Sequence, residues 1–289
     1  MSRGRGRIGV VGGSGLYALP GLATTSEARL ETPFGPPSDA YLVGELAGVP
    51  VAFLARHGRE HRILPSEINY RANVWGFKEL GCDALVSASA CGSMKESYRP
   101  TDLVLPDQFI DRTHRRVATF FGDGCVAHVS LAHPVCPHLL ETLDRTARER
   151  GARVHTGGTY LGMEGPQFST RAESFLYRSW GVDVIGMTNV QEARLCREAE
   201  ICYATMALVT DFDCWHEEEQ AVSVEAILDV LRANAATANA VLAGAVIRID
   251  AGRRCACRQA LRYAVLTRRE DVPEPTRKRL SLLMEKYWK

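Results

Sequence analysis

Short apolar runs alternate along the chain with longer stretches whose apolar residues recur at helical spacing. This alternation is typical of an α/β protein. The apolar runs predict strands at residues 8–11, 49–54, 84–90, 182–188 and 201–210. The amphipathic stretches predict helices at residues 65–80, 137–150, 170–180, 190–200 and from 224 to about 246. With 289 residues and 46% hydrophobic content, the chain is long enough for one large α/β domain, which we favour over two small ones.

The strand predicted at residues 201–210 leads directly into two acids, Asp211 and Asp213. In an extended backbone, residues two apart point to the same side, here at the edge where open α/β sheets bind ligands. Two carboxylates in one apolar site raise the pKa of at least one of them, so that one acid can donate while the other accepts. Such a pair matches the N7 acceptor and the 6-amino donor of adenine, with Asp211 donating to N7, alone or sharing the proton with Asp213. Taken alone, Asp-x-Asp favours a capping or solvated loop, so the rest of the chain has to support the base-binding interpretation.

Other predicted strands end in residues that can donate hydrogen bonds to an anion. The first strand breaks into Gly12-Gly13-Ser14-Gly15, which has neither the Rossmann glycine spacing nor a Walker lysine. The candidate phosphate-binding residues at strand ends are Ser14, Arg56, His57, Ser89 and Thr188. Each has a plain alternative, because Gly-rich turns are common tight connections and arginines often form structural salt bridges. Repetition of the pattern at several strand ends favours an anion site.

The charge balance argues against nucleic acid as a partner. The chain has 35 basic and 34 acidic residues, and the basic ones are scattered. No apolar run approaches the roughly 18 residues that a membrane span needs, and residues 1–7 lack the apolar core of a signal peptide. We therefore expect a cytoplasmic protein with a small-molecule substrate.

Nine cysteines are spread along the chain, and most of them are expected to be reduced core thiols. Cys255 and Cys257 stand apart as a Cys-x-Cys pair. Without a second Cys/His pair at ligand spacing they make a poor zinc site, so the sequence predicts no metal and leaves open a local disulfide or free thiols. Beyond about residue 250, basic residues and prolines indicate a loosely attached tail with a helical apolar stripe near its end.

Ordered blocks along the chain carry a family resemblance: GGSG at 12–15, TPFGPPSD at 32–39, ARHGR at 55–59, NYRAN at 69–73, SACGS at 89–93, EGP and FS within 164–169, MT at 187–188 and DFDCW at 211–215. Together they resemble the trimeric purine nucleoside phosphorylases, and within them the 5′-methylthioadenosine phosphorylase branch, nearly end to end. This resemblance implies an α/β fold with a mixed, twisted central β-sheet flanked by helices. It implies a single domain over residues 1–289, with a basic arm at 1–7 and a tail at about 250–289, assembled as a homotrimer or a dimer of trimers.

The resemblance also implies an activity, the phosphorolysis of 5′-methylthioadenosine or a related 5′-substituted adenosine in purine and methionine salvage. Inorganic phosphate is the co-substrate, bound by the five residues named above, and no metal or organic cofactor is implied. The Cys-x-Cys tail is similar to the tails of some archaeal members, in which a disulfide is found. The family places the nucleoside against Ala90 and Met187 at the ribose, Phe168 and Ser169 at the purine, and Val224, Ile227 and a neighbouring subunit's His128 at the 5′ substituent.

Two alternatives to this activity stay open. Family members that act on 6-oxopurines carry Asn in place of Asp211 or Asp213, because a carbonyl at C6 needs a donor facing it. Two acids favour a 6-amino base, yet a phosphorylase for adenosine or 6-oxopurine nucleosides is the alternative within the class. Gln167, where arginine is usual, and Gly186, where human-like members carry asparagine, depart from the family pattern. From another class, a non-catalytic nucleoside-binding module would keep the base pocket without the anion donors.

Overall fold

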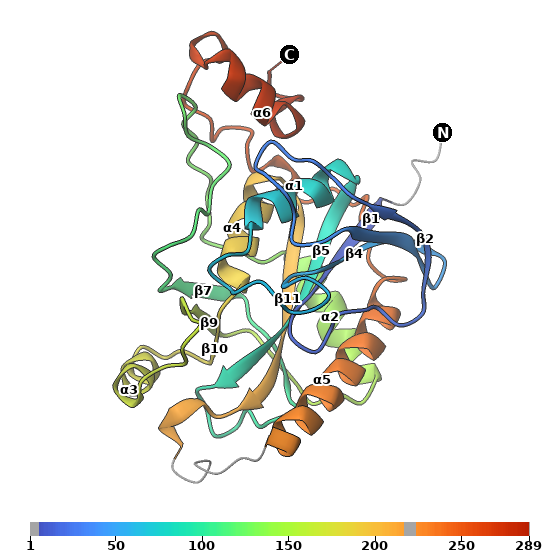
Figure 1. The fold of residues 1–289 in the computed structure, drawn as a ribbon, viewed down its shortest axis with the longest axis vertical. Coiled ribbons are helices and arrows are strands. Elements are labelled where there is room, and N and C mark those ends of the chain that lie inside the picture. Colours follow the sequence, from blue (N-terminus) through green and yellow to red (C-terminus); the bar gives the residue numbers. More distant parts are fainter. Residues whose placement is uncertain (1–5, 217–223, 289) are drawn as a thin grey trace.

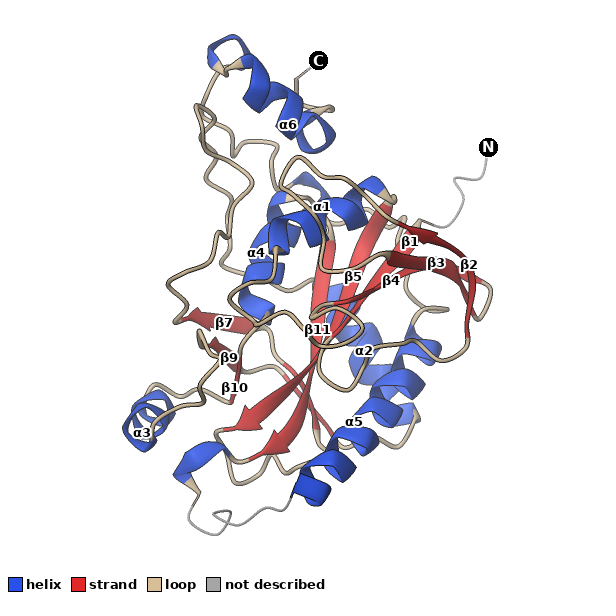
Figure 2. Ribbon diagram, viewed as in Figure 1, coloured by secondary structure: helices blue, strands red, loops and turns tan. Residues whose placement is uncertain are grey.

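The computed structural model describes residues 6–216 and 224–288, and only the helical backbone of residues 224–228. Within these residues, a mixed, twisted sheet of eleven strands forms the centre, with helices on both faces (Figures 1 and 2). The strands are β1 (Arg7–Gly12), β2 (Leu22–Ala28), β3 (Tyr41–Leu46), β4 (Val49–Ala55), β5 (Cys82–Ser93), β6 (Leu103–Leu105), β7 (Gln108–Asp111), β8 (Val154–Thr156), β9 (Thr159–Gly162), β10 (Val184–Gly186) and β11 (Cys202–Asp211). The predicted fold class is confirmed.

The helices follow the predicted amphipathic stretches closely. They are α1 (Tyr70–Glu79), α2 (Pro137–Glu149), α3 (Arg171–Ser179), α4 (Asn189–Glu198), α5 (Val224–Ala245) and α6 (Glu274–Met284), with short 3-10 turns η1 (Asp213–Trp215), η2 (Ala256–Gln259) and η3 (Arg269–Asp271). The helix predicted from residue 65 begins later, because the Asn69 side chain caps α1 by accepting from the Ala72 N–H at 3.1 Å. Among the helices of the described residues, none is both long and apolar enough to cross a membrane.

Four parallel strands form the middle of the sheet in the order β4, β1, β5 and β11. Parallel neighbours end at the same edge, so the turns that follow these strands lie close together. The antiparallel strands β3 and β2 extend the sheet beyond β4, and β6 pairs antiparallel with β11. The last residues of β5 also pair antiparallel with β10, which leads to β9 and β7. Strand β5 therefore pairs with β1 and β11 in the parallel middle of the sheet and with β10 of the β10–β9–β7 part.

The core lies on both faces of this sheet. Helices α2 and α5 pack on one face, where Leu143 and Leu242 are fully buried against the strands. Helices α1 and α4 cover the other face with residues such as Phe77 and Leu195 (Figure 2). Because both faces are covered, the first eight residues of β11 are all buried, which explains its continuous apolar run in the sequence.

The C-terminal segment packs onto this body rather than hanging from it. Leu261 and Leu280 are buried in the same cluster as α1 and α4. The Tyr287 hydroxyl donates to Glu200 at 2.6 Å, and the Thr276 hydroxyl donates to the Asp123 carbonyl at 2.8 Å. The expectation of a loosely attached tail is therefore wrong, because its apolar residues are matched by an apolar surface that composition alone does not reveal.

Candidate active site

The carboxyl ends of β1, β4 and β5 bring the predicted anion donors together. The Gly13 N–H donates to the Ala88 carbonyl on β5, and the Arg56 N–H donates to the Gly12 carbonyl on β1, both at 2.9 Å. A Cβ on Gly13 would lie 2.5 Å from Nη1 of Arg56, so only glycine lets the turn approach the guanidinium this closely. The turn that carries Ser14 thus lies directly beside Arg56 and the start of the Ser89 segment.

A buried ion pair holds Arg56 in place. Its Nε donates to Glu192 of α4 at 2.5 Å and its Nη2 donates to the Ser87 hydroxyl at 2.5 Å. The Arg56 side chain is only 1% exposed. Glu192 also accepts from the Tyr203 hydroxyl at 2.9 Å. Arg56 therefore does form a structural salt bridge, as the alternative interpretation expected. Its Nη1, however, has only a 3.4 Å contact to the Ala88 carbonyl and faces the Gly13 turn, so this atom can still donate to an anion there.

His57 is neutral at physiological pH. Burial and, to a smaller extent, the adjacent Arg56 cation lower its pKa to about 4. Its Nδ1 lies 2.8 Å from the Ile63 carbonyl, which can only accept, so Nδ1 carries the proton and Nε2 carries a lone pair. His57 therefore suits acceptance from a protonated phosphate oxygen better than service as a second cationic donor.

Ser89 and Thr188 meet through the start of α4. The Ser89 hydroxyl donates to the Asn189 side chain at 2.6 Å, and the Asn189 amide donates to the Ser87 hydroxyl at 2.9 Å. Thr188 is the N-cap of α4, is 5% exposed and makes no capping bond with its side chain. A helix N-terminus presents unpaired N–H groups that favour anions. The structure thus places Thr188 with Ser89 and Arg56 around one anion-compatible region.

The two acids lie farther along the same strands. Asp211 pairs with Gly92 of β5, and a Cβ on Gly92 would lie 3.0 Å from Asp211 Oδ1 and 3.4 Å from Asp213 Cβ. The backbone is not extended through them, as the sequence analysis assumed. Asp213 has a φ of 51° and begins η1, and its N–H donates to Asp211 Oδ1 at 2.8 Å. The tight turn still places the Asp211 carboxylate and the Asp213 side chain beside Gly92.

The environments of the two carboxylates differ. Burial raises the pKa of Asp213 above its ordinary value; the Ser174 hydroxyl, which donates to its Oδ2 at 2.6 Å, opposes this rise, and nearby Asp211 adds to it. Asp211 accepts from its own turn and from the Thr210 hydroxyl at 2.6 Å. The pair therefore combines a carboxyl that holds its proton more readily with one that is supplied with donors.

The loop between β9 and α3 closes this end of the site. Ser169 is 9% exposed and its carbonyl accepts from the Cys214 thiol at 3.2 Å, next to the acids. Phe168 is 81% exposed, so its ring is free to contact a base. A Cβ on Gly165 would lie 2.5 Å from Met187 Sδ, which shows how closely Met187 packs under this loop.

Arg116 fixes the same loop and was missed by the sequence analysis. Its Nε donates to Glu164 Oε1 at 3.1 Å and its Nη1 donates to the Met187 carbonyl. The side chain is 1% exposed, although it follows two other basic residues in an apparently polar stretch. Glu192 and Asn189 were missed for a similar reason, because a predicted helix does not show which of its polar residues face the sheet.

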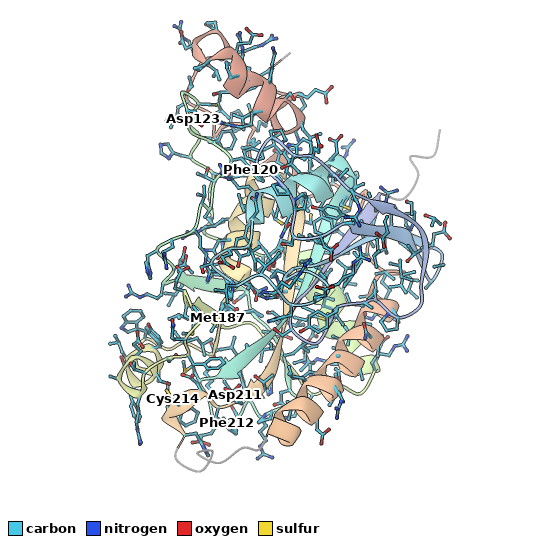
Figure 3. All side chains as sticks on the ribbon, in the orientation of Figure 1. Phe120, Asp123, Met187, Asp211, Phe212 and Cys214 are labelled. Carbon is cyan, nitrogen blue, oxygen red and sulfur yellow. The ribbon has the colours of Figure 1, made fainter. Side chains whose placement is uncertain are left out.

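The remaining predicted residues divide into three cases. Ala90 is half-buried on β5, between Ser89 and Gly92. Val224 and Ile227 lie at the start of α5, where the side chains fall outside the described residues. His128 is exposed, and its N–H donates to the Ala264 carbonyl at 2.8 Å. Figure 3 shows Phe120 and Asp123, which precede His128 in the chain, at the opposite end of the molecule from Asp211.

Known proteins match the chain along most of its length. The family model described as the phosphorylase superfamily matches residues 7–247. S-methyl-5′-thioadenosine phosphorylases from Koribacter versatilis and Gloeobacter violaceus are 54% and 56% identical, over 97% and 99% of this chain and 96% and 98% of their own.

Solved structures give the same result. A methylthioadenosine phosphorylase from an antarctic soil metagenomic library superposes with a TM-score of 0.91 at 49% identity, covering 96% of this chain and 98% of its own. The methylthioadenosine phosphorylase from Schistosoma mansoni in complex with adenine has a TM-score of 0.80 at 37% identity, covering 84% and 91%. The chain therefore belongs to the phosphorylase superfamily and, within it, to the family of the S-methyl-5′-thioadenosine phosphorylases.

Proposed function

We propose that this protein catalyses the phosphorolysis of 5′-methylthioadenosine to adenine and 5-methylthioribose 1-phosphate. The main support for the proposal is that β5 contacts two chemically different groups of residues, the anion donors and the acid pair. At Ser89 the strand passes Arg56 and the Gly-rich turn, and at Gly92 it passes the acid pair. Three residues of strand span about 10 Å. This is comparable to the distance from a phosphate below C1′, along the glycosidic bond and across the purine, to the 6-amino edge. The similarity to the two bacterial phosphorylases supports the same reaction.

The region around Arg56 and Ser89 would bind phosphate, which is the nucleophile. An oxygen of phosphate forms a bond to C1′ while the bond from C1′ to N9 of adenine breaks, through an oxocarbenium-like transition state. Catalysis at this end consists of holding phosphate below C1′ with donors that do not need to reorganise. Arg56, fixed by Glu192, and the hydroxyls of Ser14, Ser89 and Thr188 are suited to this task. Neutral His57 would accept from a phosphate hydroxyl.

The region around Asp211 and Asp213 would neutralise the negative charge that develops on the leaving base. The electron pair of the broken bond passes into the purine and raises the basicity of N7. A carboxyl that retains its proton can donate to N7, while its ionised neighbour accepts from the 6-amino group. The raised pKa of Asp213 supports a proton shared between Asp213 and Asp211. This reaction needs no metal or organic cofactor in its chemical step.

The assembly belongs to the same proposal. We place three copies in a ring, alone or as a dimer of trimers, with His128 of one copy reaching the 5′ substituent held by the next. The support is that His128 bonds to Ala264 and that the preceding residues Phe120 and Asp123 lie at the opposite end of the molecule from Asp211 (Figure 3). Light scattering should give three or six times the chain mass of 31.8 kDa, and a monomer that is fully active would remove this role of His128.

The experiment that tests the activity is a base-release assay with and without inorganic phosphate. We expect adenine release from 5′-methylthioadenosine to depend absolutely on phosphate. Burial of a methylthio group in place of a hydroxyl should make kcat/KM about 10- to 200-fold higher for 5′-methylthioadenosine than for adenosine, with inosine poorest. Preference for inosine would instead indicate a 6-oxopurine phosphorylase. Nucleoside binding without phosphate-dependent release would indicate a binding module.

A further inference from the structure

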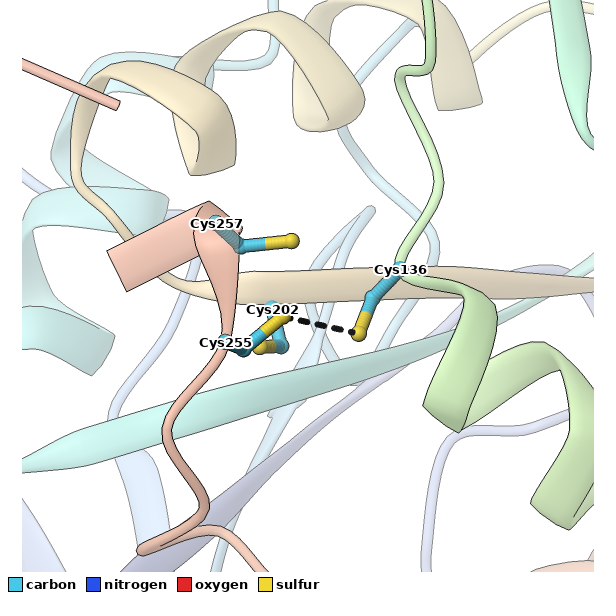
Figure 4. Close-up of side chains that lie close together, drawn as sticks. All are labelled: Cys136, Cys202, Cys255 and Cys257. Carbon is cyan, nitrogen blue, oxygen red and sulfur yellow. Dashed lines mark hydrogen bonds between the residues drawn. The ribbon is translucent and has the colours of Figure 1, made fainter. Parts of the chain in front are cut away.

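Four cysteines from distant parts of the sequence lie close together near the start of β11, at the end of this strand opposite to Asp211. Their sulfur atoms all lie within 4.8 Å of one another, and the Sγ atoms of Cys136 and Cys255 are 3.8 Å apart. Figure 4 shows the four side chains close together, with the contact between Cys136 and Cys255 dashed. The set is Cys136, Cys202, Cys255 and Cys257.

Three separate features of the fold position the four cysteines. Cys136 is the N-cap of α2, directly before Pro137, and its N–H donates to the Tyr203 carbonyl at 2.8 Å. Cys202 is the first residue of β11. Cys255 and Cys257 flank the start of η2 in the C-terminal segment. The sequence analysis rejected a zinc site because a second pair of ligands at short spacing was missing; the fold supplies that pair from residues 66 apart in the chain.

The arrangement fits the coordination chemistry of zinc. A tetrahedral ion with bonds of about 2.3 Å to sulfur separates its ligands by about 3.8 Å, so side-chain shifts of a few tenths of an ångström would bring all four sulfurs into place. Soft thiolate ligands in a tetrahedral set select Zn²⁺ over hard cations such as Mg²⁺. Cys136 and Cys257 are 0% and 4% exposed and the other two cysteines are partly buried, so such an ion would be largely shielded from solvent, as structural zinc ions are.

The end of α2 also favours a thiolate at Cys136. Cys136 lies at the N-terminus of α2, where the unpaired N–H groups stabilise negative charge. This helix end would offset part of the negative charge that four thiolates place around a dication.

We propose that Cys136, Cys202, Cys255 and Cys257 bind one structural Zn²⁺ ion. The ion would fasten the C-terminal segment to the body of the molecule through α2 and β11. It would take no part in the reaction, because Cys202 and Asp211 lie at opposite ends of β11, about 30 Å apart along the strand.

Metal analysis of the purified protein, prepared without chelators, tests the proposal. We expect about one zinc ion per chain in the parent protein. Cys136→Ser and the double variant Cys255→Ser/Cys257→Ser should contain less than about a tenth of that amount. Cys82→Ser is the matched control, since Cys82 is equally buried but outside the set, and it should keep the full amount. The cobalt-substituted parent should show the visible absorption of a tetrahedral thiolate complex, and zinc-free protein should melt several degrees lower.

Two results would overturn the proposal without relying on any variant. Parent protein without metal, whose intact mass under denaturing conditions is lower by two hydrogens for each bridge, would show that the thiols pair as disulfides. Parent protein without metal and with four freely alkylated thiols at these positions would show an unoccupied cluster of reduced cysteines. If the serine variants fail to fold, release of zinc from the parent by a chelator, together with the appearance of four reactive thiols, still supports the site.

Discussion

Replacement of Arg56 by methionine is expected to raise the phosphate concentration needed for half-saturation by about 10²-fold, with little change in the KM for the nucleoside. Charged hydrogen bonds to an anion contribute about 1.5–3 kcal/mol, and 1.4 kcal/mol corresponds to a factor of ten. Nη1 of Arg56 faces the Gly13 turn, whereas Nε and Nη2 are bonded to Glu192 and Ser87. Phosphate saturation curves at a fixed nucleoside concentration measure the effect.

This substitution also disturbs the fold, so a double variant is needed to separate the two roles. Arg56→Met leaves Glu192 buried without its partner, which costs about 3–5 kcal/mol of unfolding free energy. Glu192→Met does the same to Arg56. Replacing both residues by methionine removes both buried charges, and we expect most of the lost stability in urea to return. Phosphate use should remain as poor as in Arg56→Met. Recovery of normal phosphate saturation in the double variant would show that Arg56 is only a structural ion-pair partner.

The secondary structure was predictable because most of it depends on local patterns. The apolar run at residues 201–210 became β11, and the pattern over residues 137–150 became α2. The strand-end residues Arg56 and Ser89 could be singled out because parallel strands place their carboxyl ends at one edge. These predictions required only periodicity and the general layout of α/β sheets.

The contacts that orient the site were not predictable, because they join residues far apart in the chain. Glu192 lies 136 positions from Arg56, and no local pattern marks it as the residue that will face the guanidinium. Arg116 looked like one cation in a polar stretch, but it fixes the loop that carries Glu164. The turn at Asp213 was missed because a positive φ is rare for a residue other than glycine. Tertiary packing decides each of these features.

The acid pair gives the sharpest test of base choice. Asp213→Asn and Asp211→Asn are each expected to lower kcat/KM for 5′-methylthioadenosine by about 10²-fold or more, since each mispaired polar edge costs about 1–3 kcal/mol and the proton for N7 is lost. Both should gain relative activity on inosine, whose C6 carbonyl accepts from an amide. Asp250→Asn is the matched control, because Asp250 is exposed and its Oδ1 accepts the N–H two residues ahead, as Asp211 does.

The pH profile separates a proton donor from a residue that only supports the turn. Because burial raises the pKa of Asp213, the folded protein retains this proton to higher pH than a free aspartate does, and it loses the proton as the pH rises. In the parent protein kcat/KM for 5′-methylthioadenosine should therefore fall on the alkaline side of this transition. Asparagine cannot titrate, so in Asp213→Asn that limb should disappear while the residual rate stays level. If Asp213→Asn keeps the alkaline fall in kcat/KM and the parent ratio of kcat/KM for 5′-methylthioadenosine to that for inosine, Asp213 does not bind the base.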